Sequence, residues 1–439
     1  MIRKVPNDVR GKLKLPFFYS LLIQFFYFMA KLFGFWDYPT KMYQENMSLL
    51  FAANWIYKNS NPVIKPEKKS GLNNYFKNEL DKPFNLFPEK LKKEKSLTLS
   101  FVGDLMNPPA TEQSKDILYE NTHDLIFDAD ICCANLESTL TKTRIKPTII
   151  TTRGELKINI SEKDYNAIKG HNNKKYSIFH LANNHILDCG WEGVETTVNT
   201  ITKDNIKYFG LNLSEEDQKK SLIFNKNGFN IGFVGATYSL NHRKFPSGKE
   251  YLINYIPFHS KVKVLDISLL LTQIDYLKKQ NCDFIIVSLH WGIEFEFFPN
   301  KKQLDITHEL AEYGADLIIS HHAHVIQPYE IYNSKRDPLR KIPIFYGLGN
   351  LISHFSSPHC ALSLITNFKL SKTINNTYVD VFDIIPVFQL DSQDPETHFI
   401  KLEKLKEWHN KKLDDNELEE YVSKVSFYAD LAIGERWKG

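Results

Sequence analysis

Residues 315–328 read ADLIISHHAHVIQP, and this stretch decides how the rest of the chain is interpreted. A short, β-branched apolar run, Leu317 to Ile319, leads directly into three histidines. The run is too short for a helix and predicts a buried strand. Its histidines would then lie at the carboxyl end of the strand, where open α/β sheets place their ligands.

The spacing of these histidines suits a metal site. His322 and His324 are two residues apart, so both could point the same way from an extended segment. Each imidazole offers a neutral nitrogen at physiological pH, and two on one side of a loop can share an ion. The alternative is a polar loop whose histidines cap backbone groups, and for an isolated pair that alternative would be favoured. Other stretches of this chain end in the same way, which favours a metal site.

Apolar, β-branched segments recur along the chain and alternate with helical patterns. Helical spacing of apolar residues predicts helices at residues 40–58, 191–204, 263–280 and 303–313. Further strands are predicted at residues 97–102, 130–134, 176–182, 230–234, 282–289 and 342–346. This order predicts an α/β fold with a largely parallel sheet or sheets. Segments 361–370 and 378–390 are typical of antiparallel strands, and the charged tail from Thr397 is predicted to be helical and peripheral.

The length and composition describe a globular protein of one or two domains. We assign residues 1–95 to an N-terminal helical and aromatic segment that ends in a linker from about residue 59. Residues 96–370 form the main domain, and residues 371–439 form C-terminal strands and a peripheral helix. The net charge of +3, from 55 basic and 52 acidic residues, argues against a dedicated nucleic-acid-binding protein. The five cysteines lack CxxC spacing, which predicts free thiols and weakly favours a cytoplasmic domain.

The start of the chain has the composition of a membrane-surface segment. Residues 1–15 are basic, and residues 16–30 read PFFYSLLIQFFYFMA before Lys31. The uncharged run falls short of the ~20 apolar residues that a spanning helix needs, and no signal-peptide cleavage site follows it. Residues 10–36 therefore suit a helix lying at a membrane interface. The alternatives are a helix packed on the protein's own core and a tilted membrane anchor.

Polar side chains that can bind metals follow five of the predicted strands. They are Asp104, Glu137, Asn184 with His185, His290, and His322 with His324. Each alone is weak, because strand ends often carry capping residues. Together they form the ligand set of two-metal hydrolytic sites, in which ions ~3.5–4 Å apart hold the attacking and leaving oxygens. Glu137 or Asp104 would bridge the ions, since only a carboxylate has two oxygens to share.

Six motifs occur in chain order and carry a family resemblance. They are Gly103-Asp104, Asn135-Leu136-Glu137, ANNHILDCG at 182–190, HWGIE at 290–294, GADLIISHHAHVIQ at 314–327 and GLGN at 347–350. The set closely resembles the CapA family, which is named for capsule and poly-γ-glutamate synthesis proteins. That family is similar to the calcineurin-like metallophosphoesterases. The resemblance covers about residues 96–370.

The resemblance implies a four-layer αββα sandwich with one or two divalent metal ions, of Mn, Fe, Zn or Mg, at the strand ends. By this resemblance His185 matches the histidine that assists the leaving group. The residues that match metal ligands are Asp104, Glu137 as the bridging carboxylate, Asn184, His290, His322 and His324.

One position departs from the pattern of the phosphoesterases. They usually carry a histidine two residues after the first aspartate, and here Met106 stands there. A thioether is a poor ligand for a hard cation. One metal position is therefore expected to be weak, missing or completed by another residue.

Several further residues of the motifs are expected beside the ligands. Asn135, Asp188 and Glu294 could orient a metal-binding histidine. Loop amides are alternative partners for Asn135 and Glu294, and for Asp188 a cap of the following helix is favoured over a contact with substrate. His321 is expected to anchor its loop, and Gly347 to Asn350 to form a tight turn that lets the backbone approach the site.

Two functions follow as hypotheses. The first is a metal-dependent hydrolase that uses metal-activated water on a phosphoester or a γ-glutamyl amide, with His185 assisting the leaving group. The second is a non-catalytic, membrane-associated component of capsule polymer assembly. Expected partners are an anionic or polymeric substrate and a membrane surface or capsule-assembly proteins. Arg144, Lys146 and Arg153 could contact such a substrate, but a solvated loop is the favoured interpretation of these residues. A structural metalloprotein without an open coordination position is a weaker, third hypothesis.

Overall fold

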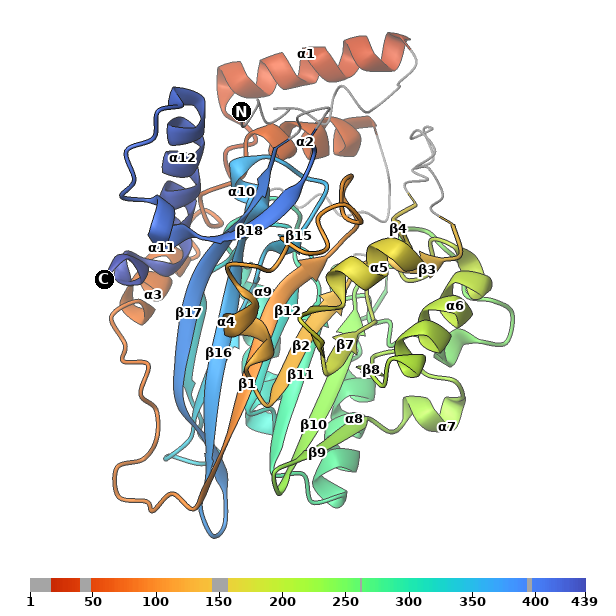
Figure 1. Cartoon of the computed structure of the whole chain (residues 1–439), viewed down its shortest axis with the longest axis vertical. Coiled ribbons are helices and arrows are strands. Elements are labelled where there is room, and N and C mark those ends of the chain that lie inside the picture. The colour runs from red at the N-terminus through yellow and green to blue at the C-terminus, as the bar shows by residue number, and fades with distance from the viewer. Residues whose placement is uncertain (1–16, 40–48, 144–156, 261–262, 393–396) are drawn as a thin grey trace.

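Two β-sheets form the centre of the computed structural model, which describes residues 17–39, 49–143, 157–260, 263–392 and 397–439 (Figure 1). The first sheet has the order β18 (Ile400–Lys404), β17 (Thr377–Asp391), β16 (Leu362–Lys372), β1 (Lys95–Leu105), β2 (Ile131–Leu136), β7 (Ile178–His180) and β8 (Lys207–Phe209). The short strand β15 (Asn350–Ile352) also pairs with β1.

The second sheet has six strands. Their order is β13 (Tyr329–Asn333), β14 (Lys341–Phe345), β12 (Leu317–His321), β11 (Phe284–His290), β10 (Phe229–Thr237) and β9 (Leu222–Lys226). The four central strands, β14, β12, β11 and β10, are parallel, and the two edge strands pair antiparallel. In the first sheet β1, β2, β7 and β8 are parallel, whereas β16, β17 and β18 are antiparallel.

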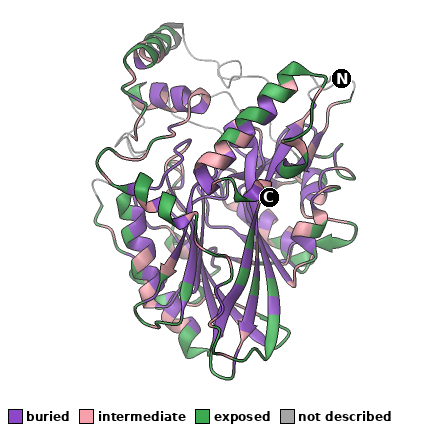
Figure 2. Cartoon of the chain, turned by 90° about the vertical axis from the view of Figure 1, so that its left-hand side faces the viewer, coloured by how far each residue is buried: buried purple, intermediate pink, exposed green. Residues whose placement is uncertain are grey.

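The two sheets pack face to face. Alternate residues of each strand point to opposite faces of its sheet, so each sheet has one face toward the other sheet and one face outward. Phe101 of β1 lies in one hydrophobic core with Phe233 of β10, between the sheets. Its neighbour Val102 points the other way, into a second core on the outer face of the first sheet. Figure 2 shows the strands mainly buried and the outer helices carrying exposed residues.

Helices cover the outer face of each sheet. The second core is closed by α4 (His123–Phe127), α5 (Glu162–Ile168) and α6 (Gly190–Lys203). The second sheet is covered by α8 (Ser268–Lys279) and α9 (Lys301–Tyr313). A capping box between Asn300 and Gln303 fixes the start of α9 by satisfying free backbone amides. These four layers confirm the αββα sandwich expected from the sequence.

The remaining elements are short connections and terminal helices. They are α1 (Phe17–Phe33), α2 (Leu49–Ser60), α3 (Leu72–Glu79), β3 (Thr139–Thr141), β4 (Asn159–Ser161), β5 (Gly170–His171), β6 (Lys174–Lys175), α7 (Glu215–Gln218), α10 (Pro358–Ala361), α11 (Leu405–Trp408), α12 (Asn416–Ile433) and the 3-10 turns η2 (Glu250–Leu252) and η3 (Arg436–Lys438).

Each predicted strand overlaps an observed one, and the predicted helices after Gly190, before Gln280 and before Gly314 are observed. All five cysteines are free. The helix predicted at 40–58 is described from Leu49 onwards, and its first residues lie outside the described part of the chain, as do Arg144, Lys146 and Arg153.

The predicted boundary at residue 370 has no counterpart in the structure. Residue 370 lies inside β16, which pairs with β17 from Leu362 to Lys372, so the C-terminal strands belong to the first sheet. The tail begins as strand β18 rather than as a helix, and α12 buries Val425 and Ala429 in the main core. The prediction of a peripheral tail was wrong, because the apolar positions of α12 face the sheet despite its charged exposed side.

The predicted linker from residue 59 also packs against the main domain. It contains the short helix α3, whose Leu72 and Phe76 are part of the core between the sheets. Val63 pairs with the backbone of Glu296, and Asn85 pairs with Val381. This segment is therefore an ordered part of the fold.

The first two helices pack on each other at the end of the molecule where α10 lies (Figure 1). Ile23, Ala30 and Trp36 are buried against Ala53 and Ile56. The other side of α1 is exposed and apolar; its residues are Leu21, Leu22, Phe25, Phe28, Leu32 and Phe33. Among the described residues, no helix has the length and apolarity needed to cross a bilayer.

Candidate metal centre

The carboxyl ends of the central strands bring the candidate ligands together. Asp104 pairs in register with Asn135 of β2, and Glu137 follows that strand directly. On the second sheet, His290 ends β11 and pairs with His321, the last residue of β12. Because the two sheets face each other, these strand ends meet between the layers.

A close backbone approach places Asp104. A Cβ atom added to Gly103 would lie 2.2 Å from the carbonyl oxygen of Gly349, so only glycine fits there. Gly349 has φ +72°, and its carbonyl accepts a 3.0 Å hydrogen bond from the Asp104 amide. The expected turn thus brings the GLGN backbone to the site, and its last residue, Asn350, begins β15.

The histidine loop after β12 is held in an unusual conformation. His322 has φ 87° and His324 has φ 55°, values that residues other than glycine seldom adopt. Such conformations cost of order 1–3 kcal/mol each and persist where the surroundings impose them. The His322 amide donates a 3.3 Å hydrogen bond to Asp104 Oδ2, which ties the loop to β1.

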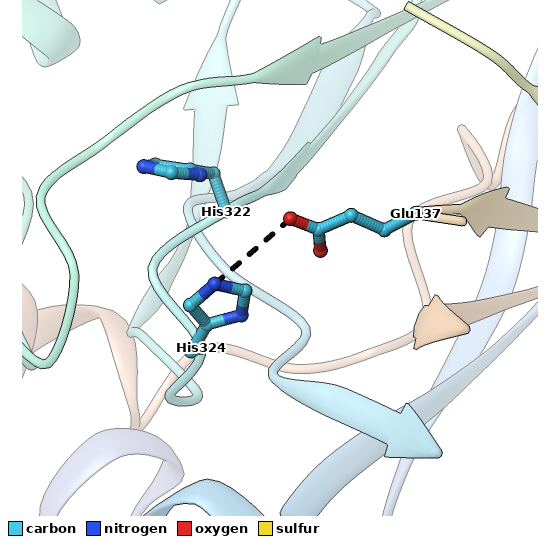
Figure 3. Close-up of side chains that lie close together, drawn as sticks. All are labelled: Glu137, His322 and His324. Carbon is cyan, nitrogen blue, oxygen red and sulfur yellow. Dashed lines mark ion pairs between the residues drawn. The ribbon is translucent and has the colours of Figure 1, made fainter. Parts of the chain in front are cut away.

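Two groups of three residues could each hold a metal ion. In the strand-end cluster, Asp104, Glu137 and His290 have ligand atoms within 4.8 Å of one another. In the loop cluster, Glu137, His322 and His324 do so as well. Figure 3 shows the Glu137 carboxylate pointing toward the space beside the two loop histidines. Both clusters share Glu137, the position expected for a bridging carboxylate.

The Glu137 carboxylate is the clearest sign that a cation belongs here. It is 0% exposed, and neither oxygen has a hydrogen-bond partner among the described residues. Its Oε1 lies 3.5 Å from His290 Nε2 and 3.9 Å from both His324 Nε2 and His185 Nε2. A buried carboxylate without partners is strongly destabilised, and a metal ion among these nitrogens would satisfy it. The residues present therefore fit a divalent cation.

Burial also shifts the pKa values of these residues in the absence of a metal ion. Burial, then the negative charge of Asp104, raises the pKa of Glu137 well above its ordinary value. Burial lowers the pKa of His290 and of His322 well below the ordinary value, so both are neutral and can coordinate. Burial opposes the ionisation of Asp104, but the contact with His321, 2.9 Å from Nδ1 to Oδ1, outweighs it and lowers the pKa.

Asparagine side chains brace the strand-end cluster. Asn135 Nδ2 donates a 2.8 Å hydrogen bond to Asp104 Oδ1 and lies 3.1 Å from His290 Nδ1. Asn184 Oδ1 lies 2.8 Å from His290 Nε2, on the side that faces Glu137. His322 Nδ1 lies 3.2 Å from the same His290 nitrogen. The predicted ligands Asn184, His290 and His322 thus point their donor atoms at one small volume.

The match to a known family covers this whole arrangement. Residues 98–355 match the family model described as bacterial capsule synthesis protein PGA_cap. The chain belongs to this family. The membership confirms the resemblance to CapA proteins that the six motifs predicted.

Two curated relatives of this PGA_cap chain have names that also refer to PGA or capsule biosynthesis. It is 26% identical over 300 residues to the PGA biosynthesis protein CapA of Bacillus subtilis (strain 168), covering 66% of this chain and 73% of that protein. It is 25% identical over 275 residues to the capsule biosynthesis protein CapA of Bacillus anthracis, covering 60% of this chain and 62% of that protein.

Two solved structures align with this PGA_cap chain at low similarity. The calcineurin-like phosphoesterase YfkN from Bacillus subtilis aligns with a TM-score of 0.38 and 14% identity, over 76% of this chain and 99% of that chain. A hypothetical protein from Thermus thermophilus aligns with a TM-score of 0.37 and 10% identity, over 66% of this chain and 99% of that chain. The αββα architecture is established by the order and pairing of the strands in the two sheets.

His185, the residue predicted to assist the leaving group, is in contact with Asp188, which was predicted to cap the next helix. His185 Nδ1 lies 2.7 Å from Asp188 Oδ2, which also accepts a 2.7 Å hydrogen bond from the Ile158 amide. The prediction that Asp188 caps the next helix was wrong, because the N-cap of α6 is Cys189 and has no side-chain cap bond. Asp188 instead lies against His185 and can orient its ring.

Met106 is fully buried and has an apolar setting in this PGA_cap chain. It packs in a cluster with Phe295, Phe355 and Cys360, and its sulfur accepts a 3.5 Å hydrogen bond from Ser353 Oγ. The two rings of that cluster also contact His324. Met106, which stands where the phosphoesterases usually have a histidine, is thus part of an apolar wall beside the loop cluster.

Sequence reasoning missed three polar residues that contact the candidate ligands. Asn350 Oδ1 lies 2.9 Å from His324 Nδ1, and Tyr238 OH lies 2.8 Å from His322 Nε2. Asn241 Nδ2 lies 3.4 Å from His185, and its Oδ1 accepts a hydrogen bond from Asn184. Tyr238 directly follows β10, so the signal used for the other strands, a polar residue after an apolar run, could have found it.

Proposed function

We propose that this protein is a metal-dependent hydrolase that acts on a phosphoester or a γ-glutamyl amide in the metabolism of a capsule polymer such as poly-γ-glutamate. The observation that carries the proposal is the buried Glu137 carboxylate, which is shared by two ligand clusters and has no hydrogen-bond partner among the described residues. The family membership and the printed descriptions of the two CapA relatives support the link to capsule synthesis.

The residues of the two clusters would hold the metal ions. Asp104, His290 and Asn184 would face one ion, His322 and His324 the other, and Glu137 both. Bound divalent ions lower the pKa of coordinated water and make hydroxide available near neutral pH. Asn135 and Tyr238 keep His290 and His322 in place through the contacts described above.

His185 supplies the proton for the leaving group in this proposal. Asp188 lies against Nδ1 at 2.7 Å and leaves Nε2 facing Glu137, 3.9 Å away. With Nδ1–H donated to the carboxylate, Asp188 fixes the orientation and tautomer of the ring. Burial of both side chains keeps water from competing for that contact.

The test is Mn²⁺-dependent turnover of two probes, an aryl phosphodiester and γ-glutamyl-p-nitroanilide. Wild-type protein is expected to turn over one probe, while Asp104→Asn and His322→Gln lose that activity with unchanged thermal unfolding. His398→Gln is the matched control, because this histidine pairs with Asp391 on a partly exposed strand connection. Equal turnover in all four proteins, or none in any of them with either probe, rejects the proposal.

A second candidate function rests on the exposed side of α1. Six large apolar residues of this helix face away from α2, and a basic stretch of sequence precedes it. We propose as an alternative that the chain is an accessory, membrane-associated component of capsule polymer assembly. It predicts binding to vesicles that contain anionic lipid, which the Phe25→Glu, Phe28→Glu double variant loses. Absence of the wild-type protein from the vesicle fraction would count against it.

A further inference from the structure

Helix α2, far from the ligands in sequence, contacts the loop that follows β11. Val63, just after α2, accepts a 2.9 Å backbone hydrogen bond from Phe297 and donates one of 2.8 Å to Phe295. Lys58 forms a 3.1 Å ion pair with Glu296, and their side chains are only 5% and 4% exposed. Separating these two segments would leave one of the two charges buried without its partner, which is strongly destabilising. The N-terminal segment therefore holds residues 295–297 in place.

The same helix contacts an acidic side chain that this loop turns toward the metal centre. Trp55 of α2 donates a 2.5 Å hydrogen bond from Nε1 to Glu294 Oε2 and packs edge-on against Phe295, 5.5 Å between ring centres. Phe295 has φ 62° and is fully buried, so the loop keeps a backbone conformation that its surroundings impose. With one oxygen fixed by Trp55, the other oxygen of Glu294 has a defined direction.

That second oxygen points at a loop-cluster histidine. Glu294 Oε1 lies 3.8 Å from His324 Nε2, and Glu137 Oε1 lies 3.9 Å from the same nitrogen. The Glu294 side chain is 16% exposed, so it is largely removed from water. Oxygens of two different carboxylates thus lie 3.8 and 3.9 Å from one imidazole nitrogen.

The contacts of His324 indicate which of its two ring nitrogens carries the hydrogen. Asn350 Nδ2 donates to the carbonyls of His324 and Cys360, which fixes the amide with Oδ1 toward His324 Nδ1 at 2.9 Å. An amide oxygen accepts only, so in the neutral ring Nδ1 carries the hydrogen and Nε2 carries a lone pair. A lone pair that faces two carboxylates repels both, and a cation between the three atoms removes that repulsion.

We propose that Glu294 is a ligand of the loop-cluster metal ion and that Trp55 is the residue that positions it. The inference rests on the proposed metal centre and completes it. The loop cluster offers two histidines and the shared Glu137, and Glu294 supplies a fourth donor on the side where Met106 leaves an apolar wall. The N-terminal helix is then part of the metal site, although the six sequence motifs do not reach it.

The experiment is metal counting on the full-length protein. Wild type, Glu294→Gln and Trp55→Phe are loaded with Mn²⁺, freed of excess ion and analysed for manganese per chain, and Mn²⁺ affinities are measured by titration calorimetry. Glu309→Gln, a change on α9, and Trp191→Phe are the matched controls. Thermal unfolding checks that each variant is folded.

Two ions per chain are expected in wild type and in both controls, and one in Glu294→Gln. Trp55→Phe keeps the aromatic packing and loses the donor, so it is expected to bind one of the two ions about 10- to 100-fold more weakly, with the other unchanged. Two tightly bound ions in folded Glu294→Gln overturn the inference but leave the proposed function standing. Wild type with one ion that Glu294→Gln retains also overturns it. Wild type without bound manganese rejects the proposed metal centre itself.

Discussion

The strand-end cluster and the loop cluster share Glu137 but are built in different ways. Asp104 and His290 lie on strands of two facing sheets. Asparagines at or just after the ends of neighbouring strands contact these two side chains. His322 and His324 lie on a loop and have left-handed backbone conformations. Tyr238 contacts His322 and Asn350 contacts His324, and Trp55 of α2 contacts the nearby Glu294. The first cluster depends on regular secondary structure, and the second depends on distant segments.

The largest expected effect is that of Glu137→Gln, which removes what the clusters share. Both ions are expected to be lost and turnover to disappear with them, since both clusters contain this carboxylate. As the pH rises above the ordinary carboxyl value of 4.5, the metal-free variant is expected to lose less stability than metal-free wild type, because burial raises the pKa of Glu137 and an amide does not ionise. Manganese counting and denaturant unfolding measure the two results. A variant that keeps both ions would show that the clusters are independent.

A smaller effect is expected for a residue that belongs to neither cluster. His185→Gln should reduce turnover by about 10²- to 10⁴-fold, the usual contribution of general acid–base catalysis, and leave both ions bound. Steady-state kinetics and metal content are the measurements. Loss of an ion together with activity would instead place His185 among the ligands.

A matched pair of asparagine variants separates the clusters. Asn135→Ala removes the brace of Asp104 and His290, and Asn350→Ala removes the brace of His324. Each change is expected to weaken one ion by about 10- to 100-fold and to spare the other. Calorimetric titration of both variants should therefore give opposite patterns for the two sites. If both variants weaken the same ion, the division into two clusters is wrong.

The smallest effect concerns acid stability near the loop cluster. His359 of α10 contacts Phe295, and burial lowers its pKa to about 3. The folded state therefore keeps this ring neutral, whereas the unfolded chain protonates it near its ordinary value of 6.5. The stability that the neutral His359 ring contributes is fully present above pH 6.5 and is lost progressively as the pH drops toward 3. His359→Gln should reduce the slope of stability against pH in that window, measured by denaturant titration, and an unchanged slope would contradict this cause.

The sequence predicted the strand-end cluster well because its residues obey local rules. Apolar runs end at Asp104, Glu137 and His290, and parallel strands of this kind place their ends at one edge. The family resemblance added the order of the motifs and the expected layers of the fold. The same local rules placed β16 and β17 as antiparallel strands.

The surroundings of the loop cluster were not predictable in the same way. Trp55 lies 239 residues before Glu294, and nothing in its own helix indicates a metal site. Asn350 was read only as the end of a turn, because its contact with His324 depends on the left-handed φ of Gly349 and on the pairing of β15 with β1. Apolar positions of α12 and of residues 63–86 also gave no sign of which sheet they cover, so the first segment was assigned to the periphery and the second to a linker.

Anomalous X-ray scattering at the manganese edge, on crystals of the Mn²⁺-loaded protein, tests the central claim most directly. Two peaks are predicted, one beside Asp104 and His290 and one beside His322 and His324, with the Glu137 carboxylate in contact with both. No peak in this region, or a single peak that Glu137 does not contact, would contradict a centre that is organised around this residue.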